Sequence, residues 1–208
     1  MSLSGDIKLS SDVEFEVPTW DQIYNMLLNL ADKVREDRFY PDVIVGICRG
    51  GWLPARVMSD LLERPELANV RVEFYLGVAE TKTEPVITQP VSASMTDKKV
   101  LIMDDVADTG KSLRLVKDHV ENQSAESAKI ATIYFKPWSE TVPDYYEKKT
   151  TCWIVFPWER KETVRNLVKK CIREKRSIEE TKSKLIKGGF DPGLAERFIR
   201  EVSVGKVD

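Results

Sequence analysis

The feature that most constrains this chain is a continuous apolar run that ends in two adjacent aspartates and then turns into a helical pattern. The run is Val100–Met103, the acidic pair is Asp104-Asp105, and the turn contains Asp108-Thr109-Gly110. Such a run predicts a parallel strand that is buried on both faces. Ligands in open α/β sheets bind beyond the carboxyl ends of these strands, so both aspartates are expected at a binding edge.

The residues after the acidic pair predict an anion site. Asp108 to Ser112 would form the turn into the N-terminus of the next helix, where backbone N–H groups and the helix dipole favour phosphate. The stretch therefore offers carboxylates for hydroxyl groups or a metal ion directly beside a cradle for phosphate.

Two other interpretations fit this stretch less well or less specifically. Gly110-Lys111-Ser112 matches the end of the P-loop pattern, but the leading glycine of that pattern would fall on Asp105. A carboxylate is a poor fit where the backbone must curl around a phosphate. An ordinary strand, turn and helix with solvated aspartates is the second alternative.

A second glycine turn occurs earlier in the chain. The buried strand predicted at 42–47 is followed by Cys48-Arg49-Gly50-Gly51 and then by a helical pattern from Trp52 to Leu62. Paired glycines allow the backbone to approach a ligand closely, and a guanidinium suits phosphate. A tight connection without a binding role remains the alternative.

The other segments complete an alternating α/β pattern. A helix is predicted over 19–37, with a capping box at Thr19 and Gln22, and strands are predicted over 70–76 and 130–135. The long polar segment 77–98 predicts either a lid that excludes water or a protruding β-hairpin.

The end of the chain predicts three short amphipathic helices that would form a small bundle. Ten Lys or Arg and four Glu between Lys161 and Phe190 give this part a net charge of +6, although the whole chain carries −2. The three cysteines are not spaced as metal ligands and are expected to be reduced. With neither a signal peptide nor a membrane span expected, the prediction is a cytoplasmic protein.

Together, the apolar strand, Asp-Asp, Asp-Thr-Gly and Lys-Ser resemble the PRPP-binding signature of type I phosphoribosyltransferases. The Arg-Gly-Gly turn is similar to the pyrophosphate loop of that family. The resemblance covers about 18–160 and implies a mainly parallel five-stranded sheet flanked by helices, with a C-terminal three-helix bundle. It also implies a catalytic domain at 1–160, with a flexible loop at about 78–97 and a base-binding region at 136–159, followed by the helical bundle at 161–208.

The resemblance implies roles for both turns. Asp104 and Asp105 would bind the ribose hydroxyls, contribute to a Mg²⁺ site and offset positive charge that develops on the ribosyl ring. Asp108 would act as the third catalytic residue, at the purine N7 proton. The 5′-phosphate of PRPP would contact Asp108, Thr109, Gly110, Lys111 and Ser112. Pyrophosphate would contact Arg49, Gly50 and Gly51, and a non-proline cis peptide is expected within Cys48–Gly50.

The base pocket is expected at Lys136, Trp153 and Ile154, with Glu159 as a further metal ligand, partly through water or PRPP. Strand-Lys-Pro, Trp-Ile and Pro-Trp-acid resemble bacterial xanthine-guanine phosphoribosyltransferases, which have Asp where this chain has Glu159. Lys136 and Asp108 favour a 6-oxopurine. The whole chain, including its helical tail, resembles crenarchaeal adenine phosphoribosyltransferases, and on that likeness adenine is the leading expectation, with AMP as product.

Two other interpretations of the protein's function remain open. One is a regulator on the same fold that binds PRPP or nucleotides and uses the basic tail on nucleic acid. The other is a pyrimidine or amino-sugar phosphoribosyltransferase, which would not need Lys136 and Trp153 together. For the leading reading, the expected partners are PRPP, a purine base, the nucleoside monophosphate and pyrophosphate. A homodimer is expected from the family, without membrane or nucleic acid.

Overall fold

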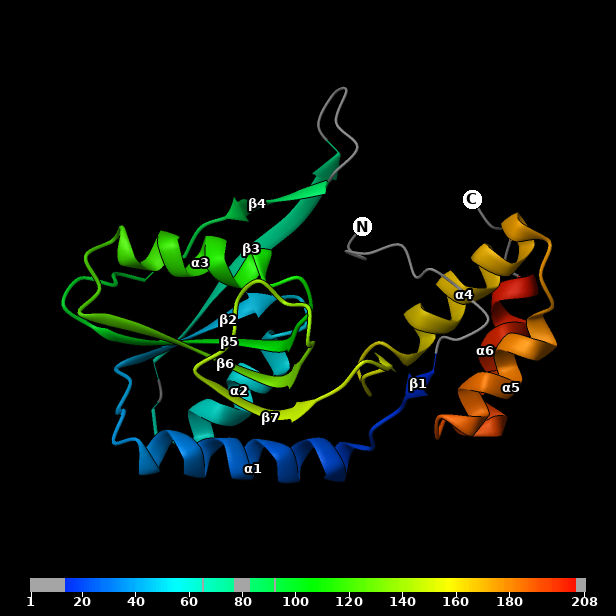
Figure 1. Ribbon diagram of the computed structural model, residues 1–208, viewed down its shortest axis with the longest axis horizontal. Helices are drawn as coiled ribbons and strands as arrows, with labels where there is room; N and C mark the ends of the chain where they lie inside the picture. The colour runs from blue at the N-terminus through cyan, green and yellow to red at the C-terminus, as the bar shows by residue number, and fades with distance from the viewer. Residues whose placement is uncertain (1–13, 65, 77–82, 92, 205–208) are drawn as a thin grey trace. The chain divides into compact units, whose positions relative to one another are not determined.

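The structure is a computed structural model that describes residues 14–64, 66–76, 83–91 and 93–204 (Figure 1). These residues form two compact units. The core unit contains residues 23–151. The helical unit contains residues 14–22 and 152–204.

The core unit is built on a six-stranded sheet in the order β4-β3-β2-β5-β6-β7. Five neighbouring strands are parallel, and they are β3 (Leu67–Leu76), β2 (Val43–Cys48), β5 (Lys99–Ala107), β6 (Ser127–Phe135) and β7 (Tyr145–Lys149). The edge strand β4 (Thr83–Gln89) runs antiparallel to β3. The mainly parallel five-stranded sheet is thus confirmed, with one antiparallel strand added at its edge.

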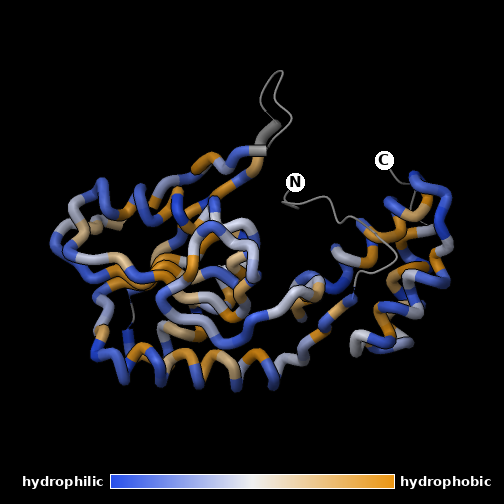
Figure 2. The backbone as a smooth tube through the Cα atoms, viewed as in Figure 1, coloured by the Kyte–Doolittle hydropathy of each residue, from blue (hydrophilic) through white to orange (hydrophobic). Residues whose placement is uncertain are grey.

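Helices cover both faces of this sheet. In Figure 1, α1 (Trp20–Glu36) and α2 (Trp52–Leu61) lie on one side of the strands, and α3 (Lys111–Glu121) lies on the other. Hydrophobic residues are concentrated in the central strands, while α1 alternates between hydrophobic and hydrophilic residues (Figure 2). Strands covered on both faces need apolar side chains on both, which is why β2 and β5 read as continuous apolar runs.

The strand order places a change of winding direction between β2 and β5. From β2 the chain passes through α2 to β3 on one side, and from β5 it passes through α3 to β6 on the other side. The carboxyl ends of β2 and β5 therefore flank the point where the winding direction reverses, which is where open α/β sheets bind ligands. A Cβ at Gly46 would lie 2.9 Å from Ala55 Cβ, so α2 packs closely on β2.

Several predicted elements are confirmed, and some are not. The capping box of α1 forms, because the Gln22 backbone N–H donates to Thr19 Oγ1 and the Thr19 N–H donates to Gln22 Oε1. Within the predicted lid at 78–97, residues 83–89 form β4, and residues 78–82 and 92 lie outside the described residues. β7 was not predicted, because its sequence Tyr-Tyr-Glu-Lys-Lys lacks an apolar run and buries only Tyr145 fully.

The helical unit combines a short ribbon with three helices. β1 (Phe15–Glu16) pairs in parallel with β8 (Trp153–Ile154), and the helices are α4 (Arg160–Glu174), α5 (Ile178–Lys187) and α6 (Pro192–Val204). Phe15, Val17 and Val155 are buried in the same apolar cluster as the helices. The predicted C-terminal helices are confirmed, while the domain boundary at residue 160 stays a prediction. The compact units divide at residue 151, because these ribbon residues bury their side chains among the helices.

No helix within the described ranges is long and apolar enough to cross a membrane.

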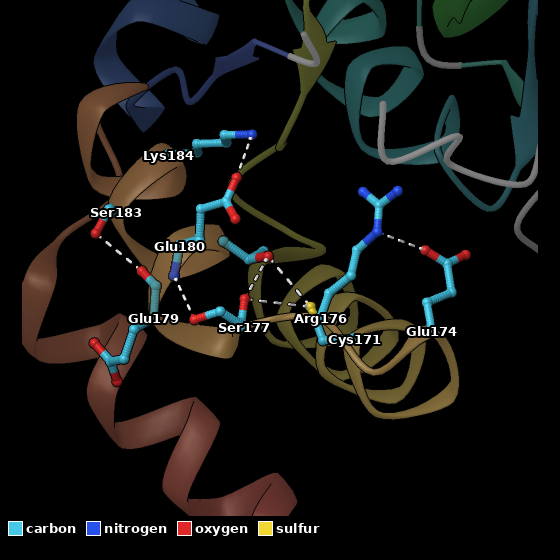
Figure 3. A network of polar contacts seen from close by, with 9 residues as sticks. Cys171, Glu174, Arg176, Ser177, Glu179, Glu180, Ser183 and Lys184 are labelled. Carbon is cyan, nitrogen blue, oxygen red and sulfur yellow. Dashed lines mark hydrogen bonds and ion pairs between the residues drawn. The ribbon is translucent and has the colours of Figure 1, made fainter. Parts of the chain in front are cut away.

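Ser177 is the N-cap of α5, and its hydrogen bond leads to a prediction about stability. The Glu180 backbone N–H donates to Ser177 Oγ, whereas Ser183 donates its hydroxyl to Glu179 O within the helix (Figure 3). Ser177→Ala removes the cap and should lower the free energy of unfolding by about 1 kcal/mol in urea denaturation. Ser183→Ala is the matched control and should change it by less than about 0.5 kcal/mol. Equal effects of the two substitutions would contradict this account.

Candidate active site

The two turns predicted from the sequence meet at the carboxyl edge of the sheet. A Cβ placed on Gly50 would lie 2.1 Å from Asp105 Oδ2, and one on Gly51 would lie 2.3 Å from Met103 O and 2.7 Å from Asp104 Cα. Real Cβ contacts are not this short, so only glycine fits at either position without displacement of its neighbours. The structure thus brings the Arg49–Gly51 turn into direct contact with the acidic pair.

The turn also contains the predicted cis peptide. The bond between Cys48 and Arg49 is cis and does not involve proline. Cys48 is partly buried, and burial raises the pKa of its thiol, while the nearby Arg71 opposes this change. The Arg49 side chain is exposed.

Burial and the neighbouring Asp105 carboxylate change the pKa of Asp104. Burial and the negative charge of Asp105 raise the pKa of Asp104 well above its usual value, although the Asp105 and Gly51 backbone amides oppose this. The Asp105 N–H donates to Asp104 Oδ1 at 2.9 Å, and Asp105 is itself only 8% exposed. Two adjacent carboxylates at this largely buried position form a site that suits hydroxyl donors or a hard cation.

The predicted phosphate cradle has the geometry of a sharp turn into α3. Gly110 has a left-handed backbone with φ of 82°, which favours glycine. The Lys111 N–H donates to Thr109 Oγ1 at 3.4 Å. The first N–H groups of a helix have no carbonyl partner in a preceding turn, and this favours an anion at the helix start. The Lys111 ammonium pairs with Glu84 of β4 at 2.6 Å, and this contact raises the pKa of Lys111.

The loop after β6 lies against this cradle. The Lys136 N–H donates to Ala107 O and the Glu140 N–H donates to Thr109 O, each at 2.9 Å. Lys136 is buried, with 6% of its surface exposed, and its Nζ lies 5.5 Å from the ring centroid of Trp138. The Trp138 indole N–H donates to Asp108 Oδ1 at 3.0 Å.

Sequence reasoning missed Trp138. It identified Lys136 at the end of a strand but took Trp153 as the aromatic partner. The position of Trp138 in the sequence could have indicated a role in the base site, because it follows Lys136 by two residues in the loop beyond a buried strand. Its contact with Asp108 joins residues 30 positions apart and could not be read from a local pattern.

The other predicted base-site residues belong to the helical unit. Trp153 and Ile154 form β8, where Trp153 packs partly against the apolar cluster and Ile154 is buried. Glu159 lies at the start of α4, and its carbonyl accepts the Thr163 N–H at 2.8 Å. The predicted roles of these three residues in base or metal binding stay predictions.

Within the part of the chain that the structure describes, no three His, Cys, Asp or Glu side chains gather as a metal cage. The acidic pair could still hold Mg²⁺, because this ion is commonly bound by one or two carboxylates together with substrate phosphates and water. The donor set therefore fits a magnesium ion that arrives with a phosphorylated substrate.

Comparisons with known proteins agree with this geometry. A family model described as a phosphoribosyl transferase domain matches residues 19–163. The chain is 34% identical to a xanthine-guanine phosphoribosyltransferase of Cereibacter sphaeroides over 68% of this chain and 84% of that protein. It is 30% identical to a xanthine-guanine phosphoribosyltransferase of Gluconobacter oxydans, over 71% of this chain and 86% of that protein.

Among solved structures, the fold matches a purine phosphoribosyltransferase from Pyrococcus horikoshii at 43% identity and a TM-score of 0.64. That match covers 70% of this chain and 94% of the other. The chain belongs to the type I phosphoribosyltransferase family, as its central motif predicted. Within that family it is a purine phosphoribosyltransferase, a pentosyltransferase enzyme.

The contact between the turns predicts different outcomes for its two glycines. In Gly50→Ala the three atoms nearest the new methyl group all belong to the Asp105 carboxylate, so the protein should fold while its turnover falls by about 100-fold, because a carboxylate predicted to be catalytic is displaced. In Gly51→Ala the methyl group meets backbone atoms, so the free energy of unfolding should fall by about 1–3 kcal/mol. Steady-state kinetics and urea denaturation of both variants test this. An active Gly50→Ala enzyme would contradict it.

The raised pKa of Asp104 predicts the direction of a pH effect. As pH rises above the ordinary carboxyl value of 3.8, the unfolded chain releases the proton before the folded protein does, so the free energy of unfolding falls. Asp104→Asn removes this penalty. At neutral pH, without divalent cations, its melting temperature should exceed that of the wild type by about 3 °C. The difference should vanish toward acid pH, and a gain that is independent of pH would contradict this account.

Proposed function

We propose that this enzyme transfers the 5-phosphoribosyl group of PRPP to a 6-oxopurine, giving the nucleoside 5′-monophosphate and pyrophosphate. The observation that carries the proposal is the buried Lys136 at the carboxyl end of β6, beside Trp138 and Asp108. A lysine ammonium has three donors and no acceptor, so it matches the O6 carbonyl of hypoxanthine, guanine or xanthine. It does not match the amino group that adenine carries at this position.

This proposal replaces adenine as the leading substrate. Adenine was expected because the whole chain resembles crenarchaeal adenine enzymes, while Lys136 and Asp108 favoured a 6-oxopurine. The matched relatives from Gluconobacter oxydans and Cereibacter sphaeroides are named xanthine-guanine phosphoribosyltransferases, which supports the second expectation. Recognition of the base depends on the pocket and not on likeness along the whole chain.

The residues at the carboxyl edge supply the functions that the reaction needs. Amides of the turn from Asp108 to Ser112 hold the 5′-phosphate, and the Arg49–Gly51 turn holds the pyrophosphate. Asp104 and Asp105 accept hydrogen bonds from the ribose hydroxyls and stabilise positive charge on the ribosyl ring. The bond from purine N9 to C1′ forms as the bond from C1′ to pyrophosphate breaks, with its electron pair leaving on pyrophosphate. The N7 proton passes to the Asp108 carboxylate.

Magnesium is the proposed cofactor. Asp104 and Asp105 would hold it together with PRPP. A bound Mg²⁺ neutralises charge on the phosphates of PRPP and so favours departure of pyrophosphate.

The partners of this reaction are PRPP and the purine base. A homodimer remains a family-based expectation, and a cytoplasmic location remains a prediction from the sequence. Binding of nucleic acid by the tail is not proposed, because several of its cations pair with acids of the same helices. Lys184 pairs with Glu180 at 3.0 Å, and Lys170 lies 3.8 Å from Glu174.

Base specificity tests the proposal directly. Pyrophosphate release with PRPP and Mg²⁺ should be faster with guanine, hypoxanthine or xanthine than with adenine. Lys136→Met keeps an unbranched side chain, one atom shorter, and removes the ammonium, so kcat/KM for the preferred 6-oxopurine should fall by about 100-fold, because a hydrogen bond from a charged group is lost. Lys161→Met, at an exposed position of the helical unit, is the control and should leave kcat/KM unchanged. A preference for adenine would contradict the proposal.

A further inference from the structure

An exposed tryptophan stands between the two polar groups proposed to read the purine ring. Trp138 has 54% of its surface exposed, so burial alone does not account for its position. Its indole N–H donates to Asp108 Oδ1 at 3.0 Å, and Lys136 Nζ lies 5.5 Å from its ring centroid. One side chain therefore contacts both the carboxylate and the ammonium.

The backbone around Trp138 is set independently of its side chain. The Ser139 N–H donates to Lys136 O at 3.0 Å, and Thr141 Oγ1 donates to Gly110 O at 3.0 Å. A Cβ on Gly110 would lie 2.5 Å from Thr141 N, so this loop and the phosphate cradle are in close contact. These bonds do not use the indole, and the loop is expected to keep its path when the side chain is changed.

The contacts of the indole have a chemical consequence for the carboxylate. A carboxylate has two oxygens, and the indole N–H can only donate. By engaging Oδ1 of Asp108, Trp138 restricts rotation of the carboxylate and leaves Oδ2 available to a second donor. Under the proposed function, that second donor is the purine N7–H.

The contact with Lys136 affects the group proposed to donate to the purine O6, whereas Asp108 is proposed to accept from N7. An ammonium close to the face of an indole is attracted by the negative face of the ring, and more strongly where water is excluded. Because Lys136 is almost fully buried, this attraction limits the positions that its ammonium occupies. The distance between the donor for O6 and the acceptor for N7 is then governed by one rigid ring.

We propose that Trp138 is a positioning residue of the base site, which orients the Asp108 carboxylate through its indole N–H and restrains the Lys136 ammonium through its ring. This inference rests on the proposed function, because it assigns Asp108 and Lys136 to the purine N7 and O6. Trp138 discriminates 6-oxopurines by keeping the acceptor and the donor at a spacing that fits their N7–H and O6.

The test separates the N–H group from the ring. Trp138→Phe keeps an aromatic face and removes the donor, so kcat with a 6-oxopurine should fall about tenfold while KM for PRPP stays the same. Trp138→Ala removes both contacts and should in addition raise KM for the base. Val142→Ala is the control, because Val142 is an exposed apolar residue of the same connection, 64% exposed. It should leave all three parameters unchanged.

A double-mutant cycle shows whether Trp138 acts through Asp108. In an Asp108→Asn background, Trp138→Phe should change kcat by less than about twofold. A tenfold loss in both backgrounds, or an unchanged kcat in the single variant, would overturn the inference. Equal melting temperatures of the wild type and Trp138→Phe show that a loss of kcat does not come from unfolding, and a lowered melting temperature together with that loss counts against a positioning role.

The two proposals fail in distinguishable ways. If the wild type uses adenine in preference to every 6-oxopurine, or uses no purine at all, the proposed function fails and the inference about Trp138 fails with it. If the wild type uses a 6-oxopurine but Trp138→Phe retains full kcat, only the inference about Trp138 fails.

Discussion

The contact between the Gly50-Gly51 turn and the Asp104-Asp105 pair is the constraint on which the active site depends. No Cβ fits at either glycine, so the turn that follows β2 lies directly against the end of β5. The turn covers the Asp105 carboxylate, and burial together with the negative charge of Asp105 raises the pKa of Asp104. Such an arrangement costs stability and is retained where the concentrated negative charge has a chemical use.

A second contact of the same kind joins the loop after β6 to the turn before α3. Hydrogen bonds from Lys136 and Glu140 to the Ala107–Thr109 segment hold this loop against the phosphate cradle. Together, the two contacts bring the ends of three neighbouring parallel strands to one edge of the sheet. The groups proposed for pyrophosphate, ribose, phosphate and base are therefore carried by turns that support one another.

Much of this arrangement could be predicted from the sequence, because its signals are local. Buried parallel strands appear as apolar runs, the start of α1 carries a capping box, and Asp-Asp followed by Asp-Thr-Gly lies within ten consecutive residues. Features without such a signal were missed. β7 has no apolar run, and the ribbon of Phe15 with Trp153 joins residues more than a hundred positions apart. The preference for adenine, inferred from likeness along the whole chain, lost support because residues outside the pocket do not determine which base is bound.

The sequence by itself determined the alternating order of strands and helices, the two glycine-containing turns and the carboxylates that identify a phosphoribosyltransferase. These features depend on neighbouring residues and on the periodicity of each element. Only the tertiary structure decided which turn contacts which carboxylate, and that the indole of Trp138 reaches both Asp108 and Lys136. The physical reason is that strand order places distant segments at the same edge, and contacts between them follow from packing that no local pattern records.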